Sequence, residues 1–271
     1  MFTLSGFADE LGPDFSANIR WWKRMGLSFV DIRSAWGINV LRLSPQHVSD
    51  IKTILDAHKI KVSCIGSPIG KTCIEDPLAV EMANLRYAVE IAERLECARI
   101  RIFSFYSRAG NILEQDREVA SRLREMIGYA KDHGIELLHE NESGVYGQGI
   151  RECVKLASEL YSSYFGMVFD PANYSVGGED ALQAEGILHP FISYMHVKDY
   201  SGTGLQMCIP GKGVSHIPEI FQRLRDRDLF VSLEPHLDFA GQFGGSTSSE
   251  NFREAIETVR VMLDSLDIMW A

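Results

Sequence analysis

The sequence has no paired-cysteine motif, no long apolar run and no excess of positive charge. Its five cysteines include no Cys-x-x-Cys spacing, so neither a zinc ribbon nor a dithiol redox site is indicated. No apolar run approaches the ~20 residues of a membrane span, and the first residues do not resemble a secretory leader. The net charge of -10 argues against a nucleic-acid partner, because such proteins neutralise phosphates with Lys and Arg.

What remains after these exclusions is an ordinary globular chain. An odd number of cysteines without a leader fits the reducing cytoplasm. The 271 residues are 45% hydrophobic and 24% charged, which is enough apolar material for one large core. No Pro/Ser-rich linker or block of charge divides the chain. We therefore expect a single cytoplasmic domain over residues 1–271 that binds a small molecule, phosphorylated or not.

Short apolar runs alternate along the chain with segments of helical periodicity. Phe15, Ile19 and Trp22, for example, fall on one helical stripe that Gly26 ends. Strands are expected at 2–7, 29–33, 61–65, 99–103, 135–140, 167–169, 192–196 and 229–234, and helices at 15–25, 44–58, 78–92, 115–133, 150–160, 180–188, 217–225 and 252–266. A glycine-rich loop is expected at 241–245, before the last helix.

Eight strand–helix units predict a parallel sheet that closes into a single (β/α)8 TIM barrel. The alternative is an open, doubly wound sheet, which would want a Gly-x-Gly-x-x-Gly fingerprint after its first strand. That turn instead reads Phe7-Ala-Asp-Glu-Leu-Gly12 and has no such fingerprint.

Charged and imidazole side chains end four consecutive strands. The apolar run before Asp170 stops there because Pro171 cannot donate a hydrogen bond to a neighbouring strand. Burying a lone carboxylate costs several kcal/mol, so Asp170 needs a cation or another partner. Glu140, His196 and Glu234 end the neighbouring strands, and in this kind of barrel all such ends meet at one mouth.

Three oxygen donors and one nitrogen suit a divalent ion such as Mn²⁺, Mg²⁺, Co²⁺ or Zn²⁺. Each residue alone has an ordinary explanation, since a strand-end Glu often pairs with Arg or Lys and a lone His often packs in a core. Their coincidence at matched positions favours one metal site made of Glu140, Asp170, His196 and Glu234.

Several segments around these residues carry a family resemblance. They are Leu138-His-Glu140-Asn141, Phe169-Asp170-x-x-Asn173, His196-Val-Lys-Asp199, Leu233-Glu234-Pro235, Gly211-x-Gly213, Ala8-Asp9-Glu10, Asp31-x-Arg33 and Trp36-Gly37. Together they resemble the xylose isomerase-like TIM barrels, a large group of sugar-phosphate isomerases and epimerases. The resemblance covers nearly the whole chain, and the Glu, Asp, His and Glu strand ends are its most specific part.

The resemblance implies a metal-dependent isomerase or epimerase of carbohydrate metabolism. Its substrate would be a ketose, a keto-inositol or a related sugar derivative, bound to one divalent ion through two adjacent oxygens. Glu140 and Glu234 would work on opposite faces of the carbon next to the carbonyl, one removing a proton and the other returning one. These roles are chemically reasonable, because a metal ion acting as a Lewis acid stabilises an enediolate and a nearby carboxylate is a suitable base.

Substrate contacts are expected around this centre. Asn173 stands where many relatives carry a histidine, and His236 follows Glu234 and Pro235 closely enough to reach the pocket. Lys198 either meets the substrate or forms a salt bridge with Asp199 or Glu234. The remaining candidates lie on loops at the mouth and are Arg33, Trp36 and Lys71.

Three side chains near this centre have a structural explanation. Trp36 could stack on a sugar, seal the core or contact another subunit. Arg101 lies in the middle of a strand and is expected to pair with a neighbouring strand. Glu142 is expected to be a solvated loop residue.

Three other functions occur on, or are compatible with, the same kind of barrel. A lyase of the inosose dehydratase type uses the same enediolate but expels a β-hydroxyl. A non-catalytic sugar-binding barrel would be suggested by loss of a ligand, and none is lost. The DNA-repair branch of the superfamily needs further histidines on early strands, whereas here those ends read Asp31-Ile-Arg33 and Ile65-Gly66-Ser67. The sequence leaves open which sugar is bound and whether the chain forms a homo-oligomer.

Overall fold

A ring of eight parallel strands forms the centre of the computed structural model, which describes residues 1–241 and 244–271. In spatial order they are β1 (Phe2–Gly6), β12 (Leu229–Leu233), β9 (Ile192–Val197), β8 (Phe165–Phe169), β7 (Glu136–Glu140), β6 (Arg99–Ile102), β5 (Lys61–Gly66) and β2 (Phe29–Ile32). A parallel bridge between Phe7 and Asp31 brings the two ends of this order together, so the barrel is nearly closed. The predicted TIM barrel is confirmed.

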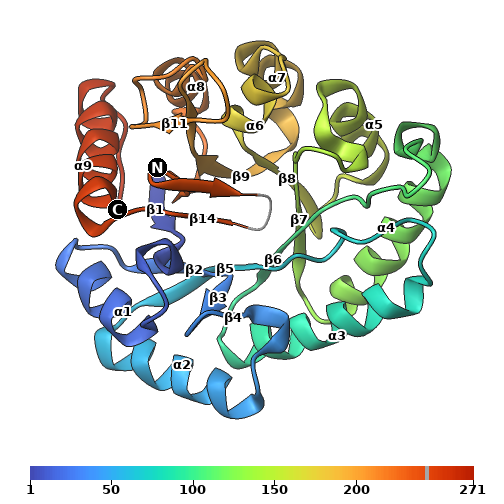
Figure 1. The fold of residues 1–271 in the computed structure, drawn as a ribbon, viewed down its shortest axis with the longest axis horizontal. Helices are drawn as coiled ribbons and strands as arrows, with labels where there is room; N and C mark the ends of the chain where they lie inside the picture. Colours follow the sequence, from blue (N-terminus) through green and yellow to red (C-terminus); the bar gives the residue numbers. More distant parts are fainter. Residues whose placement is uncertain (242–243) are drawn as a thin grey trace.

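Helices surround the strands on the outside (Figure 1). They are α1 (Phe15–Arg24), α2 (Pro45–His58), α3 (Leu78–Arg94), α4 (Asp116–Asp132), α5 (Ile150–Leu160), α6 (Pro171–Val176), α7 (Ala181–Leu188), α8 (Ile217–Leu224) and α9 (Ser249–Ser265), with short 3-10 turns at Ala8–Leu11, Val40–Arg42, Ile112–Glu114, Tyr146–Gln148 and His189–Phe191. Within the described residues, no helix combines the length and the apolar character needed to cross a membrane.

The expected strands differ from the observed ones by one or two residues at either end, but one helix was not expected. The sequence places a single helix after the sixth strand, whereas the structure adds α6 directly behind it. This helix begins because the Asp170 carboxylate accepts a hydrogen bond from the Asn173 amide at 3.1 Å, and because Pro171 occupies the first helical position. The strand-end carboxylate of Asp170 is thus also a helix cap.

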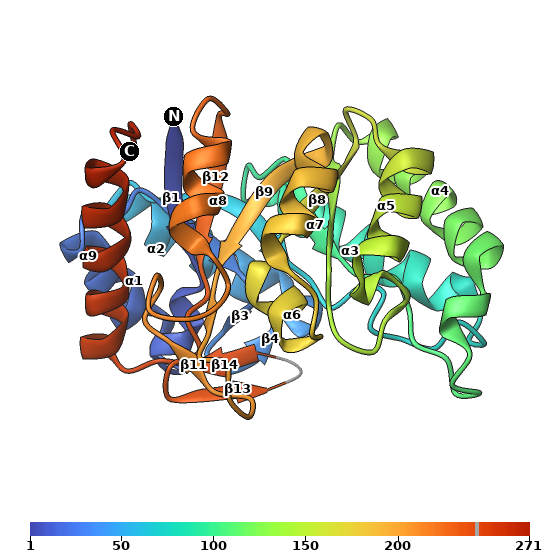
Figure 2. The ribbon, with the colours of Figure 1, turned by 90° about the horizontal axis from the view of Figure 1, so that it is seen from above.

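Additional short strands gather at the C-terminal side of the barrel. They are β3 (Ser34–Ala35), β4 (Ile38–Asn39), β10 (Asp199–Tyr200), β11 (Met207–Cys208), β13 (Phe239–Gly241) and β14 (Gly244–Ser246). Figure 2 shows β11 and the β13–β14 hairpin together on the side opposite the N-terminus. The expected glycine-rich loop falls in this hairpin, although its residues 242 and 243 lie outside the described part of the chain.

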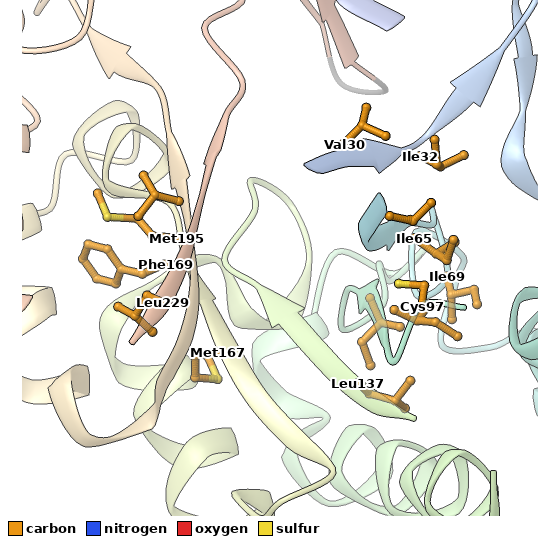
Figure 3. Packing of buried hydrophobic residues seen from close by; sticks show 14 of the residues in the cluster. Val30, Ile32, Ile65, Ile69, Cys97, Leu137, Met167, Phe169, Met195 and Leu229 are labelled. Carbon is orange, nitrogen blue, oxygen red and sulfur yellow. The ribbon is translucent and has the colours of Figure 1, made fainter. Parts of the chain in front are cut away.

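The main hydrophobic core lies between the strands and the helices. Val30, Ile32, Met167 and Phe169 belong to it, and all are buried (Figure 3). Because successive side chains of a strand point to opposite faces, Asp31 between Val30 and Ile32 points instead into the barrel.

Asp31 is a buried carboxylate surrounded by hydroxyl groups from other strands. Its Oδ1 accepts hydrogen bonds from Ser5 at 3.1 Å and from the Tyr194 hydroxyl at 2.6 Å, and the hydroxyls of Ser63 and Ser232 complete the set. Several donors from different strands can stabilise a charge that water does not reach. This polar layer ties opposite parts of the barrel together beneath the C-terminal mouth.

We expect Tyr194→Phe to lower the free energy of unfolding by about 1–3 kcal/mol, because it removes one donor from a buried acceptor without changing the packing. Urea denaturation measures this change. Tyr161→Phe is the matched control, since Tyr161 is 46% exposed and its substitution should change stability by less than about 0.5 kcal/mol. Equal effects of the two substitutions would contradict the role given to the hydroxyl layer.

Candidate metal centre

The four expected ligands come together at the C-terminal side of the barrel. Glu140 is the last residue of β7 and His196 lies in β9, while Asp170 and Glu234 directly follow β8 and β12. All four are buried, and one ligand atom of each lies within 4.8 Å of those of the other three. These residues are called the metal cluster below.

Contacts within the metal cluster are short. His196 Nδ1 lies 3.1 Å from Glu140 Oε1 and 3.3 Å from Glu234 Oε2. Lys198 Nζ lies 2.7 Å from Asp170 Oδ2 and 3.8 Å from Glu234 Oε2. The separations of His196 from the two glutamates are those of donor atoms arranged around one ion with bonds of about 2.0–2.2 Å, and Lys198 lies beside the metal cluster as a neighbouring cation.

Two oxygens of the metal cluster lack the hydrogen bonds expected of buried groups. Asp170 Oδ2 and Glu234 Oε2 accept none from the described residues, and Lys198 approaches them at ion-pair distance without hydrogen-bonding geometry. A buried acceptor without a hydrogen bond costs about 1–3 kcal/mol. A divalent ion would satisfy both oxygens, so the residues present fit a metal such as Mn²⁺, Mg²⁺, Co²⁺ or Zn²⁺.

The proton equilibria of the metal cluster reflect burial and mutual charge. Burial opposes the charged form of His196, but Glu140 and Glu234 outweigh it and raise the pKa of the imidazole to about 10. Burial raises the pKa of Asp170 to about 6, against the opposing effect of Lys198. Burial also opposes ionisation of the two glutamates, yet nearby cations hold the pKa of each below its usual range. For Glu140 these cations are His196 and Arg101, and for Glu234 the main one is Lys198.

An arginine fixes one oxygen of each glutamate. Arg101 Nη1 donates to Glu140 Oε2 at 2.7 Å, and Arg33 Nη1 donates to Glu234 Oε1 at 2.7 Å. The expected pairing of Arg101 with a neighbouring strand is confirmed. In both glutamates the second oxygen is the one that faces His196. The arginines therefore leave one oxygen of each carboxylate for the metal cluster.

Asp9 orients Arg33. Its two carboxylate oxygens accept from Arg33 Nε at 3.0 Å and from Nη2 at 3.2 Å. This two-point contact fixes the plane of the guanidinium, as carboxylate–arginine forks commonly do. The direction in which Arg33 approaches Glu234 is thus set by a residue from the turn after β1.

A cavity of about 320 Å³ opens above the metal cluster. Most of the expected substrate contacts line it, namely Arg33, Lys71, Asn173, Lys198 and His236, together with Glu140 and Glu234. Trp36 lies elsewhere, with ring-centroid distances of 5.4 Å to Phe15 and 5.7 Å to His47. Trp36 therefore packs against α1 and α2 and does not line the cavity.

The salt bridge expected between Lys198 and Glu234 is present at 3.8 Å, whereas the alternative with Asp199 is not found among the described residues. Lys198 lies nearer to Asp170, at 2.7 Å, and the Asp199 carboxylate instead accepts from the backbone amides of the following loop at Gly211, Gly213 and Ser215. The expectation that Glu142 is simply solvated is wrong, because it pairs with Lys71 at 2.8 Å and lines the cavity. This error arises from a contact between segments that are distant in sequence.

Glu10 is a site residue whose role the sequence did not reveal. Its Oε2 accepts from the His236 amide at 3.0 Å and from Thr247 Oγ1 at 2.6 Å, while its Oε1 lies 3.4 Å from His236 Nε2. Glu10, Glu234 and His236 also have ligand atoms within 4.8 Å of one another. Arg33 already supplies a cation to the shared Glu234 oxygen, so we assign no ion there.

The chain belongs to the xylose isomerase-like TIM barrel family, whose model matches residues 19–264. A search of curated proteins found no match.

Solved structures give the same fold. A D-tagatose 3-epimerase-like protein aligns over 98% of this chain and 98% of its own, with 14% identity and a TM-score of 0.77. A probable 3-DHS dehydratase from Bacillus anthracis aligns over 96% and 98%, with 16% identity and a TM-score of 0.76. A xylose isomerase-like protein from Mycobacterium smegmatis, in complex with magnesium, aligns over 98% and 97%, with 15% identity and a TM-score of 0.74.

We expect metal binding to release protons in a pH-dependent way. Between about pH 6 and pH 10 an ion must displace the proton of His196, so about one proton should be released per ion and affinity should rise as pH rises. Below about pH 6 Asp170 also carries a proton, and about two should be released. Calorimetric titration with Mn²⁺ in buffers of different ionisation enthalpy measures both numbers.

A substitution provides the control for this titration. His196→Ala should weaken Mn²⁺ binding by more than the roughly 10–100-fold that is typical of losing an outer partner, and should abolish proton release near pH 8. Mn²⁺ binding of unchanged affinity in this variant would remove His196 from the ligand set.

Proposed function

We propose that this protein is a divalent-metal-dependent isomerase or epimerase that acts on a ketose, a keto-inositol or a related sugar derivative. One observation carries the proposal. Two buried glutamates, each with one oxygen held by an arginine, direct their second oxygens to a shared cluster at the floor of a small-molecule-sized cavity. Family membership and the epimerase-like solved structure support the same reaction class.

Glu140 and Glu234 are proposed as the proton-transfer pair. One of them removes the proton from the carbon next to the carbonyl, and the electron pair of the C–H bond moves to form an enediolate. The other returns a proton to the opposite face, which gives the epimer, whereas return to the adjacent carbon gives the aldose–ketose isomer. Their lowered pKa values keep both glutamates ionised in the free protein, so each can accept a proton. The glutamate that returns a proton to the substrate first takes that proton from water.

Glu140, Asp170, His196 and Glu234 would hold the ion. When bound, it supplies Lewis-acid stabilisation of the negative charge that develops on the carbonyl oxygen. Magnesium is supported by the related structure solved with that ion, and manganese, cobalt and zinc fit the same donor set.

The remaining cavity residues are proposed to hold the sugar. Lys198, Asn173 and His236 lie beside the metal cluster and carry donors for substrate hydroxyls. Lys71 lines the same cavity and pairs with Glu142. The Arg33 guanidinium is engaged by Asp9 and Glu234, so its contribution is to orient Glu234 and to close one side of the cavity.

A lyase is the second candidate, and the likeness to a probable 3-DHS dehydratase favours it. The first step would be the same proton abstraction by a glutamate. The electron pair would then form a carbon–carbon double bond while the C–O bond to the β-hydroxyl breaks. The leaving hydroxyl would take the abstracted proton from the glutamate and depart as water. Product analysis separates the two, because epimerisation conserves mass and dehydration removes one water.

We expect Glu140→Gln and Glu234→Gln to keep the fold and to slow solvent deuterium incorporation next to the carbonyl by about 10²–10⁴-fold, since an amide cannot act as the base. Proton NMR of a panel of ketoses and keto-inositols in D₂O with Mn²⁺ measures the exchange. Glu254→Gln is the control, because Glu254 is exposed and pairs with Lys212 far from the cavity. Persistent exchange in both site variants would refute the assigned roles.

Arg101→Lys tests the orientation of Glu140 separately from its charge. Lysine keeps the positive charge but lacks the planar fork, so we expect kcat to fall by about 10–100-fold with a smaller change in KM. Steady-state kinetics of the substrate found in the exchange screen give both constants. If Arg101→Lys matches the wild type while Arg101→Ala is inactive, charge alone suffices and the orienting role is wrong.

A further inference from the structure

The cavity changes in character from its floor to its rim. The floor carries the ionised groups of the metal cluster and its partners. One part of the wall beyond the floor is apolar, whereas Asn39, Glu142 and Ser143 line other parts of the cavity. Leu205 and Met207 come from the segment after β10, and Ala240 comes from β13. Figure 2 shows these two segments on the same side of the barrel. We call Leu205, Met207 and Ala240 the apolar rim.

Leu205 is unusual within this rim because 72% of its surface is exposed although it lines the cavity. A large aliphatic side chain in water at the edge of a polar site offers contact area to a ligand that extends beyond the floor. Val176, at the end of α6, adds an apolar side chain to the same cavity wall. A ligand confined to the floor would leave this surface in water.

Charges at the floor are already matched. Each Lys and Arg among the described residues that line the cavity is ion-paired, Arg33 with Asp9 and Glu234, Lys71 with Glu142, Arg101 with Glu140, and Lys198 with Asp170.

We propose that the substrate is an uncharged keto sugar that carries an apolar substituent. The polyhydroxy ketone lies on the floor, and the substituent lies against the apolar rim. A phosphorylated sugar is disfavoured because each Lys and Arg that lines the described part of the cavity already has an ion-pair partner, so the phosphate would have to compete with a carboxylate for its cation. The inference rests on the proposed function, because it assumes that the metal cluster holds the ketone end.

Three ligands that differ at a single position test this inference. They are D-fructose, D-fructose 6-phosphate and 6-O-benzyl-D-fructose, titrated calorimetrically into Mn²⁺-loaded protein. We expect the benzyl ether to bind about tenfold more tightly than D-fructose, because roughly 55 Å² of buried apolar surface has that effect. D-fructose 6-phosphate should bind more weakly than D-fructose.

Substitutions at the rim assign the effect to its residues. Leu205→Ser should reduce the ratio between the benzyl ether and D-fructose affinities to about twofold or less. Val261→Ser is the matched control, since Val261 is 68% exposed on α9 and away from the cavity, and it should leave the ratio unchanged. Light scattering checks whether Leu205 instead contacts a second copy of the chain.

The outcomes separate this inference from the function on which it rests. Tightest binding of the phosphate, equal affinity for D-fructose and its benzyl ether, or a ratio that survives Leu205→Ser would each overturn the inference. A change in oligomeric state caused by Leu205→Ser would overturn it as well. If deuterium exchange occurs but the affinities do not fall in the expected order of benzyl ether, D-fructose and D-fructose 6-phosphate, only the inference is refuted. If the affinities fall in that order but no sugar shows exchange, the proposed proton transfer is refuted. Absence of binding by all three ligands would overturn the inference, whereas the exchange screen over ketoses and keto-inositols tests the proposed function separately.

Discussion

Pairing of buried opposite charges is the constraint on which this site depends. The barrel brings the ends of its strands together where water is largely excluded, so each ionised side chain there needs a partner. Arg101 forms an ion pair with Glu140, Arg33 with both Asp9 and Glu234, and Lys198 with Asp170. Removing one member would leave its partner buried and unpaired, which is why the proposed chemistry and the stability of the fold share residues.

The same pairing gives the two glutamates their direction. A free carboxylate at a strand end could present either oxygen to a ligand. Here Arg101 and Arg33 each bind one oxygen, and the other oxygens of Glu140 and Glu234 turn toward His196. Preorganisation of this kind lowers the reorganisation needed when charge develops during a reaction. The arginines therefore connect the architecture of the barrel to the chemistry proposed for it.

The interior of the barrel is layered along its axis. Asp31 and its hydroxyl donors form a lower polar layer, the metal cluster lies at the strand ends, and the apolar rim stands above the cavity. The lower layer connects β2 to β1, β5, β9 and β12, and so supports the strands that carry His196 and precede Glu234. The two lower layers are built from side chains at successive inward-facing positions of the barrel strands, whereas the apolar rim comes from segments beyond the strand ends.

The sequence by itself determined the barrel and the identity of its four strand-end residues. Strand periodicity is local, and parallel strands in a closed barrel have their ends at one side, so Glu140, Asp170, His196 and Glu234 could be brought together without coordinates. Tertiary structure alone decided that Glu10 lies against His236 and that Arg33 binds Glu234, contacts that cross more than 200 positions of the chain. It also turned Trp36, whose backbone adopts a left-handed conformation with φ of 54°, away from the cavity. Such contacts depend on how the ends of the barrel meet and how its loops turn, and no local pattern of residues encodes either.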